Sequence, residues 1–351
     1  MCGYDDMGPL GLSGLLVEQY NLIAPLPPPP DPLLSPLSLL LSRLRSLSDS
    51  ADSGDSAGSI VRSLLRLRSG RDEAVARVAA SVAAEIRAWI DRETVDRLVA
   101  ALRSGSEERE PLLRALEARA ARGFDARLQD ALLRAGAFAA VEAALADPRA
   151  APPRVRDRCA AAALALVRFN RDVFVGPVLM GPAVGALVSA ASPAALRALS
   201  GLVAAIRSPL IDELHARGAL PRLVALLAAP DLEVRSLALE LALVLGHYGR
   251  KEAVDAMIAE GLIKRLVCLQ RSDHGGALIE MDGPDPSASA RTPFASTVAR
   301  FAVEVEVGEG MREREKRSTK QEIVRRVKEA VISPAEEVTV LAEVLWGSTP
   351  W

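Results

Sequence analysis

The stretch that decides the fold reads Ile211-Asp-Glu-Leu-His-Ala-Arg-Gly-Ala-Leu-Pro-Arg-Leu-Val-Ala-Leu-Leu-Ala-Ala-Pro-Asp-Leu-Glu-Val-Arg-Ser-Leu-Ala-Leu-Glu-Leu-Ala-Leu-Val-Leu245. Its apolar residues recur every three or four positions, the spacing that places them on one side of an α-helix. Gly218 interrupts this spacing, because glycine adopts the positive φ that ends one helix and turns the chain into the next. Pro230 and Asp231 interrupt it again, and aspartate readily caps the first turn of a helix. The stretch therefore predicts two short helices and a long third one.

Similar segments recur along the chain at a nearly constant interval, which is the signature of a repeat protein. The second helix of the stretch carries an apolar stripe at Leu220, Leu223, Val224 and Leu227. An isolated helix could not bury this stripe, so we expect neighbouring copies to stack and cover it. The aligned segments begin at Glu93, Gly136, Gly181, Gly218 and Gly261, at spacings of 43, 45, 37 and 43 residues, and a weaker sixth copy begins near Ser59.

The 211–245 stretch closely resembles the armadillo repeat. The shared features are a first helix that ends at Gly218, the sequence Leu-Pro-x-Leu-Val-x-Leu-Leu from Leu220, and a third helix that opens with Glu-Val-Arg at Glu233. The resemblance covers roughly residues 59–310. It implies an all-α fold, a right-handed α-α superhelix with C-terminal capping helices. A two-helix array of the HEAT type is the alternative, and the glycine motif and its copies favour three helices per repeat.

Composition agrees with a helical core. Apolar residues make up 50% of the 351 residues but aromatic residues only 3%, so the core must come from Leu, Ala and Val, as in close-packed helices. The chain has a net charge of -2, so it lacks the strong positive field of a general nucleic-acid binder. We therefore expect no nucleic-acid partner. No apolar run approaches the roughly 20 residues of a membrane span.

The three cysteines predict a reducing compartment. Cys2, Cys159 and Cys268 are far apart and form no CxxC pair. We therefore expect the protein in the cytoplasm, the nucleus or both. Cys159 and Cys268 lie in apolar helical runs, where we expect them to act as small buried hydrophobic residues.

The pattern along the chain predicts four parts. Residues 1–58 form a Pro/Ser-rich segment, expected to be partly disordered, in which 33–47 has the spacing of a helix. The repeat array occupies 59–310 and contains a polar, flexible insertion at 272–291. Cap helices are expected within 311–346, before a short tail at 347–351.

The segment 312–328 has two interpretations, because it contains eight basic and three acidic residues. It resembles a bipartite nuclear-localisation signal. The helix expected from about Met311 to Val331 also carries an apolar stripe at Ile323, Val324, Val327 and Val331, which would dock it on the array and leave its charges solvated and partly paired. We favour the cap helix.

No pattern for catalysis or metal binding is present. His215, His247 and His274 are scattered, and none has a metal-ligand partner at a familiar spacing. The chain has no phosphate-binding loop, dinucleotide fingerprint or nucleophile elbow. We therefore expect no enzymatic activity, no catalytic residue, no cofactor, no metal and no small-molecule substrate.

The family resemblance implies a protein or peptide partner, bound in a concave groove lined by third helices. Nuclear import receptors of this class place Trp and Asn there, and the matching positions are Glu240 and Val244, so that function is not expected. No U-box-like segment is found either. The chain is similar to plant-type stand-alone armadillo arrays, which indicates a non-catalytic interaction scaffold or adaptor. The alternative is an adaptor or substrate-binding subunit linked to a ubiquitin ligase.

The third helix expected from Asp231 to Gly249 supplies the candidate binding residues. Its apolar residues follow core spacing and leave another side open. This mixed surface offers few side chains that could hydrogen-bond to a peptide backbone, so specificity would come from charge pairing and a few apolar contacts. The candidates on the open side are Arg235, Glu240, Val244 and His247.

Overall fold

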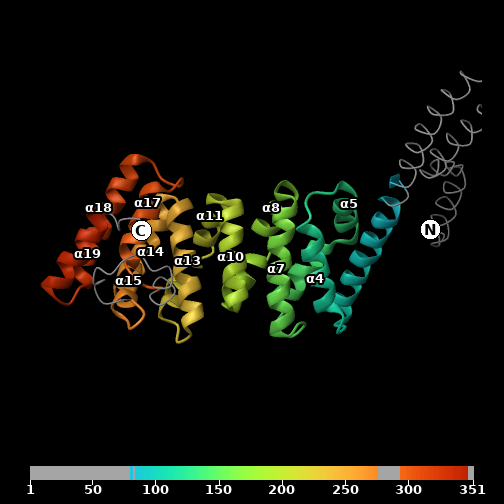
Figure 1. Ribbon diagram of the computed structural model, residues 1–351, viewed down its shortest axis with the longest axis horizontal. Helices are drawn as coiled ribbons and strands as arrows, with labels where there is room; N and C mark the ends of the chain where they lie inside the picture. Colours follow the sequence, from blue (N-terminus) through green and yellow to red (C-terminus); the bar gives the residue numbers. More distant parts are fainter. Residues whose placement is uncertain (1–79, 82–83, 276–292, 347–351) are drawn as a thin grey trace, which may run out of the picture. The chain divides into compact units, whose positions relative to one another are not determined.

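A computed structural model describes residues 80–81, 84–275 and 293–346 (Figure 1). Four of the expectations concern residues outside these ranges. They are the N-terminal segment 1–58, the repeat near Ser59, most of the insertion at 272–291 and the tail at 347–351. The chain divides into two compact units, Met1–Ile90 and Asp91–Trp351. The second unit contains the repeats.

Every regular element in the described part of the second unit is a helix, and no strand occurs there. Residues 91–104 are helical and are followed by α4 (Arg109–Ala120), α5 (Ala126–Ala135), α6 (Ala137–Ala146), α7 (Pro153–Phe169), α8 (Arg171–Met180), α9 (Ala183–Ala190), α10 (Pro193–Ile206), α11 (Ser208–Ala216), α12 (Leu220–Ala225), the short 3-10 helix η1 (Leu226–Ala228), α13 (Leu232–Tyr248), α14 (Lys251–Ala259), α15 (Leu262–Arg271), α17 (Thr297–Val307), α18 (Glu313–Ala330) and α19 (Pro334–Trp346).

The helices form groups of three, and each group stacks on the next. The groups are α5-α6-α7, α8-α9-α10, α11-α12-α13 and α14-α15-α17, with η1 extending α12. The third helix of each group packs against the third helix of its neighbour, so α4, α7, α10, α13 and α17 form a continuous series. Figure 1 shows α7, α10 and α13 side by side. The unit is therefore an all-α solenoid, as the sequence predicts.

The expected turn glycines separate first from second helices in three groups. Gly136, Gly218 and Gly261 have φ of 65°, 64° and 84°, where a side chain would be strained. Gly181 differs, because its φ of -87° is ordinary. Glycine is needed there for space, since a Cβ would lie 2.7 Å from the carbonyl oxygen of Pro177. Gly181 thus marks the same boundary between first and second helix as the other three glycines, with a different backbone geometry.

The remaining landmarks of the deciding stretch also lie where the sequence places them. Asp231 caps α13, and its carboxylate accepts hydrogen bonds from the backbone N–H groups of Glu233 and Val234. Glu93, the start of the first aligned segment, differs because it lies inside continuous helix with no break before it.

The C-terminal helices cover the end of the array. Helix α18 packs against α14, α15 and α17, and α19 packs against α17 and α18. Ile323 and Val327 are fully buried, while Val324 and Val331 are partly buried against the same core. The apolar stripe of the 312–328 segment thus docks on the array, and its charges stay outside.

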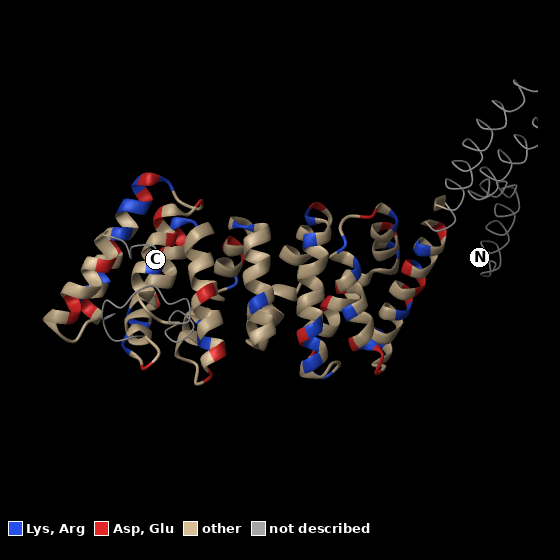
Figure 2. Cartoon of the chain, viewed as in Figure 1, with Lys and Arg blue, Asp and Glu red and all other residues tan. Residues whose placement is uncertain are grey.

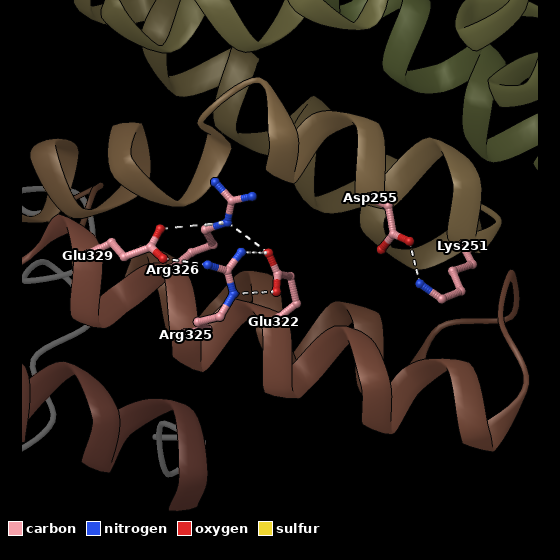
Figure 3. A network of polar contacts seen from close by, with 6 residues as sticks. All are labelled: Lys251, Asp255, Glu322, Arg325, Arg326 and Glu329. Atoms are coloured by element: carbon pink, nitrogen blue, oxygen red, sulfur yellow. Dashed lines mark hydrogen bonds and ion pairs between the residues drawn. The ribbon is translucent and has the colours of Figure 1, made fainter.

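The charges on α18 are largely paired along the helix. Figure 3 shows Glu322 between the guanidinium groups of Arg325 and Arg326, and Arg325 also reaches Glu329. Lys320 bridges to Glu306 of α17 at 2.7 Å. Several cations of the segment that resembles a localisation signal therefore have acidic partners within the protein.

The two cysteines of the array have opposite environments. Cys159 in α7 is fully buried, and desolvation raises the pKa of its thiol to about 12. Cys268 in α15 is exposed, so the expectation that it is buried was wrong. The apolar residues around it, Val267 and Leu269, are buried, but position 268 lies one helical turn from exposed Lys264 and shares its outer side.

Candidate functional site

The third helices share one pattern of burial along their length. In α7, α10, α13 and α17, pairs of buried residues alternate with positions that reach the surface. Because these helices pack side by side, matched positions form rows across the repeats. We call this surface the third-helix face. Its rows are Ala161, Arg197, Glu240 and Arg300; Ala165, Gly201, Val244 and Glu304; and Arg168, Ala204, His247 and Val307.

Three of the four candidate residues lie together on this face. Glu240, Val244 and His247 follow each other at intervals of four and three residues, which aligns them on one side of α13. Glu240 is exposed, and the other two are half-buried. Nδ1 of His247 lies 2.8 Å from Oε2 of Glu304 in α17, so His247 joins two neighbouring third helices.

Arg300 completes a charged cluster between α13 and α17. Burial lowers the pKa of its guanidinium group, and the nearby carboxylates of Glu240 and Glu304 oppose that effect by favouring the charged form. The Arg300 side chain also donates a hydrogen bond of 2.9 Å to the carbonyl oxygen of Pro293. The cluster therefore brings a cation and two acidic side chains near one another on α13 and α17.

The fourth candidate, Arg235, lies elsewhere on α13. It precedes Glu240 by five residues, which is about 140° around a helix with about 100° per residue. Its guanidinium group lies over the ring of Phe294, 5.6 Å from the ring centre. Its Nε is buried and has no hydrogen-bond partner within the described part of the chain. Arg235 lines a cleft of about 430 Å³ between α13 and α15, so the structure separates it from the other three candidates.

Polar contacts continue between the other third helices. Arg197 of α10 forms an ion pair with Glu233 of α13. Arg168 of α7 lies over Gly201 of α10, where an added Cβ would be 3.3 Å from its Nη2. The sequence pattern alone does not single out these residues, nor Arg300 and Glu304 of α17. An alignment of the third helices would place these residues in matched positions. The burial of each helix residue is needed to set that alignment, and the sequence alone does not give it.

The other two histidines do not join His247. His215 is exposed in the last turn of α11. The carbonyl oxygen of His274 accepts the backbone N–H of Phe294 at 3.2 Å. Within residues 80–81, 84–275 and 293–346, no group of three or more potential metal ligands occurs.

Residues of both charges are distributed along the described helices. Figure 2 shows Lys and Arg interspersed with Asp and Glu over the helices, without one large field of a single sign. Across the described residues, no single helix is both long and apolar enough to cross a membrane, and only the bent pair α8 and α9 reaches that length and composition together.

Comparison with known proteins identifies similar solved structures. No protein-family model matches the chain, and no curated protein matches it. A designed armadillo repeat protein is 19% identical, with a TM-score of 0.48 over 71% of this chain and 98% of that one. An engineered protein is 20% identical, with a TM-score of 0.48 over 72% and 95% of the two chains. A designed armadillo repeat protein in complex with the peptide (KR)4 is 18% identical, with a TM-score of 0.46 over 71% and 99%.

Proposed function

We propose that this chain is a non-catalytic scaffold or adaptor that binds a protein or peptide partner across the third-helix face. The observation that supports the proposal is the set of matched, accessible positions on α7, α10, α13 and α17. Stacked repeats bring such positions into register, so one extended partner can meet a side chain from every repeat.

The chemistry of the face favours recognition of side chains over recognition of the partner's backbone. Its first row alternates in charge through Arg197, Glu240 and Arg300, and its second row is small or apolar until Glu304. No asparagine or glutamine stands in the three rows, so amide side chains do not contribute to binding there. A partner with alternating acidic and basic residues would complement the first row.

Reversing two charges of the first row tests the proposal. The variant Arg197→Glu with Glu240→Lys keeps the net charge, and both side chains are exposed, so the fold should persist. We expect affinity capture from the native cell, read by quantitative mass spectrometry, to lose most of the specific partners.

A matched control places the same changes on other helices. Asp130→Lys in α5 with Arg222→Glu in α12 also reverses one charge of each sign at exposed positions. This control should retain the partners of the unchanged protein. Equal capture by both variants, with unchanged circular dichroism and thermal midpoint, would refute binding through the third-helix face.

The same experiment separates the proposal from its alternative. An adaptor or substrate-binding subunit of a ubiquitin ligase would recover ligase components together with ubiquitinated proteins. A general scaffold would not. Fractionation of the same cells tests the proposed location in the cytoplasm, the nucleus or both.

A further inference from the structure

The cleft at Arg235 is separate from the third-helix face. It opens between η1, the first turns of α13, and α15, and its volume of about 430 Å³ lies in the range of ligand sites. Leu227 and Leu269 supply buried apolar walls. Cys268 places its exposed thiol at the same cleft. The cleft can therefore hold a few side chains of a bound segment, but not a folded domain.

The charge around the cleft is predominantly positive. Arg235, Lys264 and Arg265 line it, and Glu260 is the one acidic residue among the lining residues that the structure describes. No ion pair joins the three cations to an acidic residue within the part of the chain that the structure describes. Arg235, Lys264 and Arg265 therefore bring three positive charges to one cleft without an ion-pair partner among the described residues.

Arg235 also has an unmet hydrogen bond. Among the described residues its Nε–H, which is shielded from water, has no acceptor, and this is unfavourable for a charged donor. The ring of Phe294 beneath the guanidinium group restricts its orientation. A guanidinium group held in this way presents N–H donors in the fixed geometry that suits a carboxylate.

We propose that the cleft binds an acidic peptide segment of a partner protein, with an Asp or Glu carboxylate at Arg235, Lys264 and Arg265 and a neighbouring apolar side chain against Leu227 and Leu269. This inference deepens the proposed function and rests on it, because it supplies a cationic anchor for an acidic residue of the same partner, beside the third-helix face. The apolar walls distinguish this occupant from a nucleic-acid backbone, which would need an extended basic surface instead.

Cys268 provides a local readout of occupancy. In a Cys2→Ser version of the full chain it is the exposed thiol, since Cys159 is buried. The probe is a pool of fluorescein-labelled nonapeptides with a central Leu-Glu-Leu-Glu and randomised flanks, and the matched pool contains Gln in place of Glu. Fluorescence anisotropy measures binding, and mass spectrometry measures alkylation of Cys268 by iodoacetamide.

We expect the Glu pool to bind at least about tenfold more tightly than the Gln pool and to slow alkylation of Cys268 by at least about fivefold. Lys264→Gln with Arg265→Gln should weaken binding by at least about tenfold. The control Arg149→Gln with Arg154→Gln removes two exposed charges outside the cleft and should leave binding unchanged.

Three results would overturn the inference. The first is equal or absent binding of the two pools, and the second is binding that leaves Cys268 alkylation unchanged. The third is equal protection by an octanucleotide of thymidine, which would make a phosphate backbone the occupant. Peptide binding that is lost in Arg197→Glu with Glu240→Lys but kept in Lys264→Gln with Arg265→Gln would support the proposed function while rejecting the cleft.

Discussion

Phe301 of α17 packs directly against Gly246 of α13, so closely that a Cβ on Gly246 would lie 2.8 Å from Cε2 of the ring. This contact is one of the points at which two neighbouring third helices meet. Both residues are buried, so the ring has little freedom to move aside.

The first prediction concerns this contact. Gly246→Ala should destabilise the protein by about 1–3 kcal/mol through overpacking, although alanine favours helix by about 1 kcal/mol over glycine. The control Gly185→Ala lies in α9, where an added Cβ would meet nothing within 4 Å among the described residues, and should be neutral or stabilising. Urea unfolding followed by circular dichroism measures both. Equal midpoints for the two variants would show that the helices do not approach this closely.

The second prediction concerns α18 as a cap. Val324→Asp with Val327→Asp puts charges where one side chain is fully buried and the other partly buried, and should cost at least about 3 kcal/mol. Arg325→Gln with Lys328→Gln changes exposed side chains and should have little effect on stability. Thermal unfolding compares the two double variants, and similar losses of Tm would contradict docking of α18 through its apolar stripe.

The third prediction concerns acid sensitivity. Hydrogen bonds from Arg325 and Arg326 lower the pKa of the Glu322 carboxyl group from 4.5 to about 2. Because the pKa is lower in the folded state, the stabilisation is present above pH 4.5 and is lost as the pH falls toward 2. Glu322→Gln should therefore lower Tm at pH 7, by about 1–3 °C for partly exposed pairs, and the difference should shrink at about pH 3. Glu107→Gln changes an exposed residue that forms no ion pair with the described residues, and it should show no such pH dependence.

The fourth prediction uses the two thiols. Iodoacetamide at about pH 8 should modify Cys268 in the folded protein and leave Cys159 unmodified, because burial raises the Cys159 pKa to about 12 and blocks access. In urea above the unfolding midpoint both should react. Mass spectrometry of the peptides reports each site, and rapid modification of Cys159 in the folded state would contradict the packing of α7.

Features encoded within one turn of helix were predictable from the sequence. Gly218 with its positive φ and Asp231 with its two capping hydrogen bonds act on adjacent residues, so their effect is visible locally. The start of α19 also reflects a local signal, because Pro334 opens the helix. The need for glycine at position 181 is not visible in this way, because lack of space for a Cβ depends on how the chain folds back toward the carbonyl group of Pro177.

The faces of the helices were less predictable, because neighbours distant in sequence decide them. Periodicity placed Glu240, Val244 and His247 on one side of α13. It could not show that Arg235 stacks on Phe294, a residue beyond the insertion. Nor could it show that Cys268 lines a cleft instead of the core, since residues on both sides of it are buried.

The contacts between third helices also fix the order in which these repeats can be assembled. Phe301 fits α13 because Gly246 leaves room for it, whereas the matching position on α10 is Val203. Excising α11 to α13 and rejoining the chain would press the ring against a branched side chain. Arg197 would lose Glu233 in the same step. The repeats have similar backbones, but the side chains at each contact between third helices fit one particular neighbour. Shuffling, duplicating or removing a single repeat would therefore require redesign of both faces of the new junction.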